Sequence, residues 1–156
     1  GAFGYFQFMP STMKNFAIDY DKNSYIDLKN NNDAYASAAN YLNKIGWNNE
    51  EPCFYKINLS NEVPKKYLNV SAKKLVEKRK LSYFRKYINN DSIIDNKYDN
   101  FVVSIITPDK DIIPDAQNLS PAYVVFNNYE IILKWNRSLR FSLAVCTLKD
   151  KFKNEL

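Results

Sequence analysis

The most constraining feature of this sequence is a pair of short amphipathic segments joined by a loop rich in Asp and Asn. Residues 10–18 and 33–45 repeat apolar side chains at helical spacing. Asp33 is a suitable N-cap for the second segment, and Gly46 can take the left-handed position after its last turn. We therefore expect two helices that hold the intervening loop between rigid ends.

The loop has the spacing of a calcium-binding loop of the EF-hand type. Oxygen-bearing side chains stand at positions 1, 3, 5 and 9 of that register: Asp19, Asp21, Asn23 and Asp27. The Tyr25 carbonyl is at position 7. Ser24 replaces the usual Gly at position 6, at a strain cost of about 1–2 kcal/mol, and Asn30 at position 12 lacks a carboxylate. Asp33 could complete a longer cage; alternatively, the segment is a solvated turn and Asp33 only an N-cap.

The rest of the chain predicts strands and two further helices. The strands are expected over 54–59, 101–106, 122–126 and 129–133, and the helices over 71–81 and 138–152. Ser138 is expected to cap the last helix. Its inner face is expected to hold Phe141, Ala144, Val145, Leu148 and Phe152.

These elements predict an α+β fold. We expect three segments: a core segment with the calcium loop (1–50), a small β-containing lobe (51–125), and a return strand with a C-terminal core helix (126–156). The 46% share of hydrophobic residues supports a globular core, and no apolar run approaches the roughly 18 residues of a membrane-spanning helix.

Two residue types restrict the possible chemistry. The sequence contains no histidine, which excludes Ser-His-Asp and Cys-His catalysis and leaves a carboxylic acid as the expected proton donor. Cys53 and Cys146 have no metal or redox spacing, so we expect both to pack as small hydrophobic side chains. A disulfide between them would require an oxidising compartment.

The ordered motifs at both ends resemble the lytic murein transglycosylase B family. The first block reads Gly1-Ala2-Phe3-Gly4-x-x-Gln7-Phe8-Met9-Pro10-Ser11, followed by the Asp loop and Asp33-Ala34-x-x-Ser37-x-Ala39-Asn40-Tyr41. The second runs from Asn128-Tyr129 through Lys134-Trp135-Asn136-Arg137-Ser138 to Ala144-Val145. Together they cover roughly half of the chain, and the resemblance implies a lysozyme-like helical core fragment.

The resemblance implies cleavage of the β-1,4 bond between N-acetylmuramic acid and N-acetylglucosamine without water. One carboxylic acid protonates the leaving oxygen, and the muramic C6 hydroxyl attacks C1 to leave a 1,6-anhydro end. In the family this acid is a Glu that precedes the Gly-Ala-x-Gly motif, to which Gly1 already belongs. We therefore expect the acid upstream of this chain, assign none of its carboxylates to that role, and expect the fragment alone to be inactive.

The resemblance also implies two sets of site residues. The calcium ligands would be Asp19, Asp21, Asn23, the Tyr25 carbonyl and Asp33, and the substrate-binding residues Gln7, Tyr41, Trp135 and Asn136. Amides can pair with sugar hydroxyl and acetamido groups, and flat rings suit the C–H face of a sugar. Each has a structural alternative, in which Gln7 braces a turn, Asn136 begins a helix, and the two aromatic residues are core rings. Phe141 stands where the family usually has Tyr.

Two other classes compete with the enzyme. The missing acid favours a non-catalytic, calcium-stabilised glycan-binding module. A basic stretch could favour nucleic acid: Lys73, Lys74, Lys78, Arg79 and Lys80, followed by Tyr83, Phe84, Arg85 and Lys86. Such a face is usually solvated, or could meet anionic stem peptides or wall polymers. We expect peptidoglycan glycan strands as partner, no nucleic acid, no membrane span in this chain and a monomer. From the family resemblance, we expect a periplasmic or outer-membrane associated location.

Overall fold

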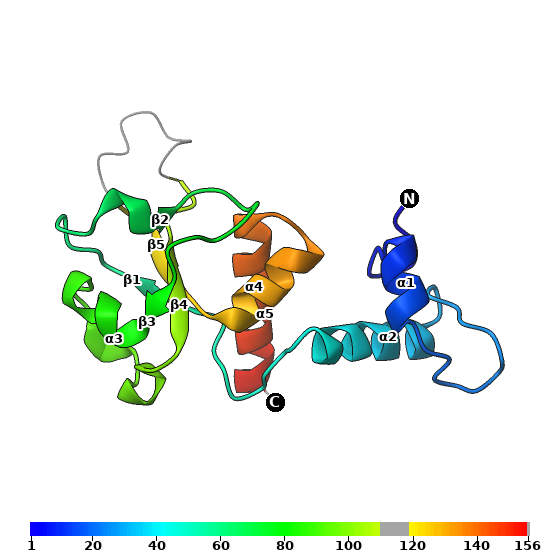
Figure 1. Cartoon of the computed structure of the whole chain (residues 1–156). Helices are drawn as coiled ribbons and strands as arrows, with labels where there is room; N and C mark the ends of the chain where they lie inside the picture. Colours follow the sequence, from blue (N-terminus) through cyan, green and yellow to red (C-terminus); the bar gives the residue numbers. More distant parts are fainter. Residues whose placement is uncertain (110–118, 156) are drawn as a thin grey trace. The chain divides into compact units, whose positions relative to one another are not determined.

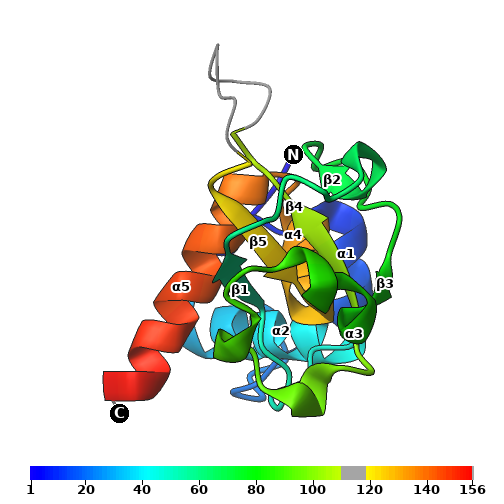
Figure 2. The same ribbon diagram turned by 90° about the vertical axis from the view of Figure 1, so that its left-hand side faces the viewer.

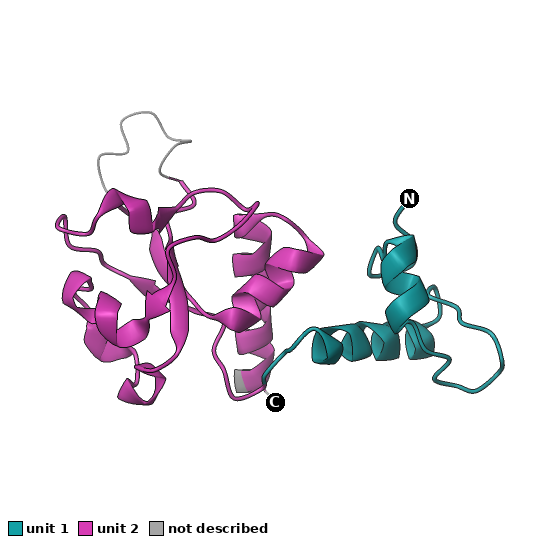
Figure 3. Cartoon of the chain, viewed as in Figure 1, with its two compact units in different colours: residues 1–48 teal, residues 49–156 magenta. Residues whose placement is uncertain are grey.

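The computed structural model describes residues 1–109 and 119–155. The described chain forms two compact units, residues 1–48 and residues 49–156 (Figure 3). Its mixture of helices and a small sheet confirms the predicted α+β class. None of the helices in the described ranges combines the length and apolar character needed to cross a membrane. The three-segment division expected from the sequence remains a prediction.

The first unit contains the predicted helix–loop–helix. Helix α1 spans Pro10–Phe16 and helix α2 spans Asn31–Lys44 (Figure 1). The expected N-cap Asp33 is wrong: α2 begins two residues earlier, and the Asn30 side chain accepts the Asn32 N–H at 2.9 Å. Asp33 lies inside the first turn and is fully buried, because its carboxylate points to the preceding loop instead of to its own helix.

The second unit is built on a five-stranded sheet. Its strands are β1 (Phe54–Ile57), β2 (Leu68–Asn69), β3 (Arg79–Lys80), β4 (Val102–Ile106) and β5 (Ala122–Val125). The order is β1-β5-β4-β2, with β3 also paired to β4; of these described pairs, β2–β4 is parallel and the others are antiparallel. The expected strands over 54–59, 101–106 and 122–126 are therefore confirmed, each shorter than predicted.

Helices cover and connect these strands (Figure 2). Short turns of helix are η1 (Lys65–Tyr67), α3 (Leu81–Phe84), η2 (Arg85–Tyr87), η3 (Asp91–Ile93) and η4 (Asn96–Tyr98), and the longer helices are α4 (Asn127–Trp135) and α5 (Leu139–Glu155). A buried cluster joins the short helices to the sheet. At its centre, the Phe126 ring makes edge contacts with Tyr98 at 5.6 Å and Phe101 at 6.3 Å.

The expected strand over 129–133 is wrong, because this run forms α4. Tyr129, Ile131, Ile132 and Leu133 are all buried, and a short run with so many buried apolar residues has no periodicity that separates strand from helix. The helix start is fixed from outside: the Glu51 carboxylate accepts the Asn127 N–H at 2.8 Å.

The expected basic helix over 71–81 is also wrong. The segment is an irregular loop that ends in β3. The buried Asn69 side chain accepts the Val76 N–H at 2.7 Å and donates to the Val76 carbonyl at 3.2 Å, so it replaces the partners that Val76 would have in a helix. The next residue, Glu77, has a positive φ of 55°, which a helix does not allow.

The last helix is confirmed, but its expected inner face is not. Ser138 caps α5 as predicted, since its hydroxyl oxygen accepts the Phe141 N–H at 3.2 Å. The buried positions are instead Leu139, Ser142 and Cys146. Four of the predicted core residues are exposed: Ala144, Phe141 (41% exposed), Leu148 (53%) and Phe152 (56%).

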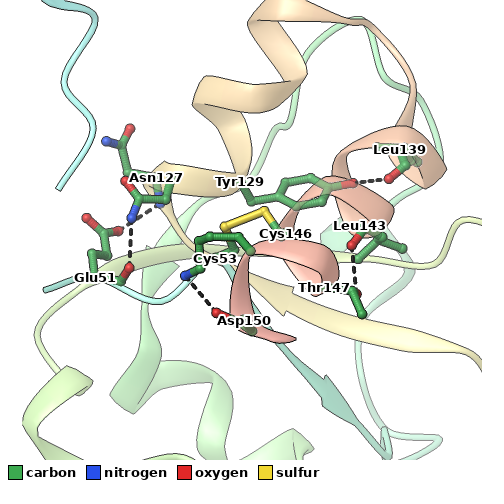
Figure 4. The surroundings of a disulfide bond; sticks show 11 residues. Glu51, Cys53, Asn127, Tyr129, Leu139, Leu143, Cys146, Thr147 and Asp150 are labelled. Atoms are coloured by element: carbon green, nitrogen blue, oxygen red, sulfur yellow. Dashed lines mark hydrogen bonds and ion pairs between the residues drawn. A yellow bond between two sulfur atoms is a disulfide. The ribbon is translucent and has the colours of Figure 1, made fainter. Parts of the chain in front are cut away.

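The reason for this rotation is a covalent bond between α5 and the start of the sheet. Cys53 and Cys146 are fully buried and form a disulfide, with their Cα atoms 6.0 Å apart. Figure 4 shows the bond beside Tyr129, whose hydroxyl donates to the Leu139 carbonyl at 2.7 Å. The expectation that the cysteines are only packed hydrophobic side chains is therefore wrong, and the disulfide points the Cys146 face of α5 inward.

Candidate functional site

The loop between α1 and α2 brings three acidic side chains together. Carboxylate oxygens of Asp19, Asp21 and Asp33 lie within 4.8 Å of one another. Asp33 is the buried member, and it accepts the Tyr20 N–H at 2.8 Å and the Asp27 N–H at 2.9 Å. These bonds lower the pKa of Asp33 below its ordinary value, and the bond from the Asp27 N–H has the largest effect. The carboxylate is therefore held in its charged form.

Backbone N–H groups shape the exposed side of the loop. Asp19 accepts the Asn23 N–H at 3.1 Å and the Ser24 N–H at 2.8 Å, while the Asn23 side-chain oxygen accepts the Tyr25 N–H at 2.8 Å. Ser24 has a φ of 70°, so the turn that normally uses Gly is present here with a Ser. Tyr25 is 69% exposed, so its side chain is not buried within the loop.

Three carboxylates in this space fit a hard cation, which prefers oxygen ligands. The structure brings together three of the five predicted metal residues and places the other two, Asn23 and Tyr25, in the same loop. The role of each as a ligand remains a prediction.

Gln7 lies in a tight turn at the start of the first unit. Its φ is 51°, and its side-chain amide donates to the Gly4 carbonyl at 2.8 Å. Gly4 also has a positive φ of 75°, and a Cβ there would stand 2.5 Å from the Leu28 Cβ. Only glycine fits this close approach, so the turn presents Gln7 at the surface. The bond to Gly4 uses one of the two amide N–H groups of Gln7.

Tyr41 is half-buried on α2 in the same unit. Its ring makes edge contacts with Phe8 at 5.8 Å and with Phe16 at 4.9 Å. Burial raises the pKa of the Tyr41 hydroxyl, so it stays protonated at neutral pH. Because Phe8 follows Gln7 directly, the ring contact places Tyr41 next to the Gln7 turn.

Trp135 and Asn136 end helix α4 in the second unit. Trp135 is the last helical residue and is partly exposed, and Asn136 is the C-cap. The Asn136 N–H donates to the Ile132 carbonyl at 3.0 Å, and its own carbonyl accepts the Ser138 N–H at 2.7 Å. These backbone bonds fix the position of Asn136 and leave its side chain exposed. Contact of these residues, or of Gln7 and Tyr41, with a ligand remains a prediction.

Glu51 is a buried carboxylate that sequence reasoning missed. It is 8% exposed, and burial raises its pKa, while its bond from the Asn127 N–H acts in the opposite direction. The Glu51 carbonyl also accepts from the Asn128 side chain at 2.7 Å. In a chain without histidine, a buried carboxyl is a candidate acid, but these bonds make it the acceptor for the first turn of α4 (Figure 4). No local pattern around Glu51 identifies this role.

Comparison with known proteins gives one consistent result. The family described as Transglycosylase SLT domain matches residues 1–150. A curated relative, the membrane-bound lytic murein transglycosylase B of Escherichia coli K12, is 47% identical over 47 residues, which are 30% of this chain and 13% of that protein.

Solved structures are similar over nearly the whole chain. SltB3 of Pseudomonas aeruginosa, in complex with NAG-anhNAM-pentapeptide, has a TM-score of 0.79 and 29% identity, covering 98% of this chain and 39% of that one. The Escherichia coli lytic transglycosylase Slt35, in complex with calcium, has a TM-score of 0.67 and 23% identity, covering 95% of this chain and 43% of that one. The chain thus spans less than half the length of these relatives. The similarities support the lysozyme-like architecture expected from the sequence.

Proposed function

Because the chain belongs to the Transglycosylase SLT domain family, we propose that it is part of a lytic transglycosylase that cleaves the β-1,4 bond between N-acetylmuramic acid and N-acetylglucosamine. The product carries a 1,6-anhydro end. The family match over residues 1–150 carries this proposal. The SltB3 complex with an anhydro-muramic ligand, 29% identical to this chain, supports it. Because the relatives described above are transglycosylases, they give no support to a non-catalytic glycan-binding module.

The chain contributes glycan contacts in this proposal. Gln7 and Asn136 pair with hydroxyl or acetamido groups through their amides, and the Tyr41 and Trp135 rings face the C–H surfaces of the sugars. The turn at Gly4 and the C-cap of α4 support these roles, because they hold both amides at the surface with a fixed backbone.

The proton comes from a Glu outside residues 1–156. The use of the Glu51 carboxylate to bind the first turn of α4 supports this placement. The acid protonates the leaving oxygen and then accepts the proton of the C6 hydroxyl, so a single carboxyl group serves both steps. This differs from glycosidases that flank the bond with two carboxylates.

Calcium stabilises the loop between α1 and α2 in the same proposal. Asp19, Asp21 and Asp33 supply carboxylate oxygens, and Asn23 and the Tyr25 carbonyl complete the set. The short distances among the three carboxylates support this assignment. Slt35, a relative of the same fold, was solved with calcium. The ion is structural in this proposal, because its ligands come from the segment that joins two helices and none of them is among the proposed glycan contacts.

The protein acts on peptidoglycan as a monomer in the periplasm or at the outer membrane. The disulfide between Cys53 and Cys146 supports a location outside the cytoplasm, since such bonds persist in oxidising compartments. The lytic murein transglycosylase relative supports the cell wall as the place of action.

The test is release of 1,6-anhydro muropeptides from purified murein, measured by mass spectrometry. The 156-residue chain should release none, whereas a longer form of the protein that includes the preceding Glu should release them, since general acid catalysis contributes about 10²–10⁴-fold. Release by the 156-residue chain would contradict the placement of the acid. If the longer form is folded and also releases none, the proposed activity is wrong.

Two variants of the longer form test the contacts. Gln7→Ala and Asn136→Ala should reduce turnover with little change in thermal midpoint, because exposed polar contacts to a ligand add little to the empty fold. Asn43→Ala, at an exposed position on α2, is the matched control and should leave turnover unchanged. Equal losses of stability and activity would favour purely structural roles for the two amides.

A further inference from the structure

A cleft in the second unit has a strongly positive lining. It lies between the loop that precedes β3 and the end of α4, and it has a volume of about 360 Å³. Its charged lining residues are Lys73, Lys74, Lys78, Lys134, Arg137 and Glu130. Five cations against one carboxylate leave an excess of four positive charges, so the cleft attracts anions.

The loop that forms one side of the cleft is fixed in place. The Asn69 side chain bonds to both backbone polar groups of Val76, and Leu75 is only 2% exposed. Lys78 reaches across to α4, where its ammonium lies 2.6 Å from both carboxylate oxygens of Glu130. This side of the cleft is therefore preorganised, so the free energy of ligand binding does not include the cost of ordering the loop.

Four of the lining cations form no ion pair with the residues that the structure describes. Within residues 1–109 and 119–155, the ion pair of Lys78 with Glu130 accounts for the one carboxylate of the lining, and the structure gives Lys73, Lys74, Lys134 and Arg137 no ion pair. All four side chains belong to exposed residues. Their mutual repulsion falls when several carboxylates enter the cleft.

We propose that this cleft binds the carboxylates of the peptide stems that peptidoglycan carries on its muramic acid residues. The inference rests on the proposed function, because it places the stem beside the glycan contacts. Lys134 and Arg137 flank Trp135 and Asn136 directly in the sequence, so a glycan bound at Asn136 presents its attached peptide near the cleft. Arg137 offers a guanidinium fork that matches a carboxylate.

The lining favours a peptide over a nucleic acid. Its apolar members are Ala72, Leu75 and Leu133, and no aromatic side chain lines the cleft within the described ranges. Single-stranded nucleic acids are held largely by bases stacked on aromatic rings. Aliphatic walls with cations at the rim instead suit the methylene and methyl groups of a short acidic peptide.

The experiment measures the binding of soluble muropeptides to the 156-residue chain by calorimetry. The probes are a disaccharide–tetrapeptide, the same compound with its peptide carboxylates converted to amides, and the disaccharide without peptide. The amidated probe should bind about threefold to tenfold more weakly than the acidic one, as expected for the loss of two or more partly exposed charge contacts. Raising the salt from about 0.1 M to about 1 M should remove most of this difference.

Charge variants locate the effect. Lys73→Gln combined with Lys74→Gln should weaken binding of the acidic probe by a similar factor and leave binding of the amidated probe unchanged. Arg137→Gln, on the α4 side of the cleft, should also weaken binding of the acidic probe. Lys56→Gln combined with Lys65→Gln, at exposed positions outside the cleft, removes the same charge and should have no effect. Thermal midpoints of all variants check that each chain is folded.

The outcomes separate the two proposals. If the amidated probe binds as tightly as the acidic one, or if the cleft and control variants behave alike, the stem site is wrong while glycan binding stands. If neither the muropeptide nor the disaccharide binds, the stem site and the proposed glycan contacts are both wrong. If a short single-stranded oligonucleotide displaces the acidic probe with higher affinity, the cleft serves nucleic acid and the inference is overturned.

Discussion

Calcium should raise the thermal midpoint of the chain, and Asp21→Asn should remove most of that rise. The carboxylate oxygens of Asp19, Asp21 and Asp33 lie within 4.8 Å of one another, and two unit charges at this distance repel by about 0.9 kcal/mol even in bulk water. A divalent cation replaces repulsion by attraction. Because the unfolded chain does not hold the three carboxylates together, the ion binds the folded state preferentially.

The size of the effect follows from mass action. Free calcium at a hundred times the dissociation constant adds about 2.7 kcal/mol to the free energy of unfolding. For a chain of 156 residues, this corresponds to a rise in midpoint of about 5–10 °C. Ser24 holds the turn without Gly, and Asn30 is engaged as the N-cap of α2. We therefore expect a dissociation constant of about 10⁻⁴–10⁻³ M, as in extracellular calcium modules.

The assay is a melting curve in chelator, in magnesium and in calcium up to about 100 mM, which is a hundred times the weaker of the expected dissociation constants. Magnesium should raise the thermal midpoint less than calcium does, because it gives up its bound water less readily. Asp21 is the best residue to change, since it is exposed and its carboxylate accepts the Asn23 N–H at 3.2 Å, a bond that Asn can keep. Asp27→Asn is the matched control, because Asp27 lies in the same loop but outside the three-carboxylate cluster.

Two results would refute this reasoning. One is a wild-type midpoint that calcium leaves unmoved, and the other is an Asp21→Asn variant that responds as strongly as wild type. Acid provides an independent check. N–H groups lower the pKa of Asp33, so its contribution to stability is complete above the ordinary value of 3.8 and is lost as the pH falls through the folded-state pKa. The calcium response should disappear over the same range.

Three other predictions concern the second unit. Cys53→Ser, or reduction of the wild type, should lower the free energy of unfolding by about 4–5 kcal/mol, since the disulfide closes a sequence separation of 93 residues; equal midpoints with and without reductant would contradict this. Asn69→Ala should lower the free energy of unfolding, measured by chemical denaturation, by about 2–3 kcal/mol. It should also speed hydrogen exchange at the Val76 N–H, because it removes the partner of the two Val76 backbone groups. Burial raises the pKa of Glu51 above its ordinary value of 4.5, so wild-type stability should fall as the pH rises from there through the folded-state pKa. Glu51→Gln should flatten that pH profile, and an unchanged slope would show that another group titrates.

Elements with strong local signals were predictable from the sequence. Helix α2 has regular apolar spacing and ends before Gly46, and the strands over 102–106 and 122–125 are rich in β-branched and aromatic residues. The three carboxylates of the loop were also predictable, because alternate residues of a tight loop can point to one place. For Asp33 the sequence leaves two roles open, a cation ligand or the N-cap of its own helix, and in the structure its carboxylate accepts the Tyr20 and Asp27 N–H groups. A helix N-cap and an acceptor for loop N–H groups both use Asp, so the sequence alone does not separate the two roles.

The two wrong element predictions, over 71–81 and 129–133, have the same physical cause: a polar side chain from another segment binds the backbone there. Asn69 holds Val76 from seven residues away and thereby replaces an expected helix by a loop. Glu51 binds the N–H of Asn127 from 76 residues away and fixes the start of a helix where a strand was expected. Neither partner is marked by periodicity, which describes only one segment at a time. The two sides of the basic cleft are this loop and this helix, so the cleft exists only after both long-range contacts form. A site of this kind therefore has no local sequence signature, whereas the acidic loop, whose three carboxylates lie within one short stretch of chain, does.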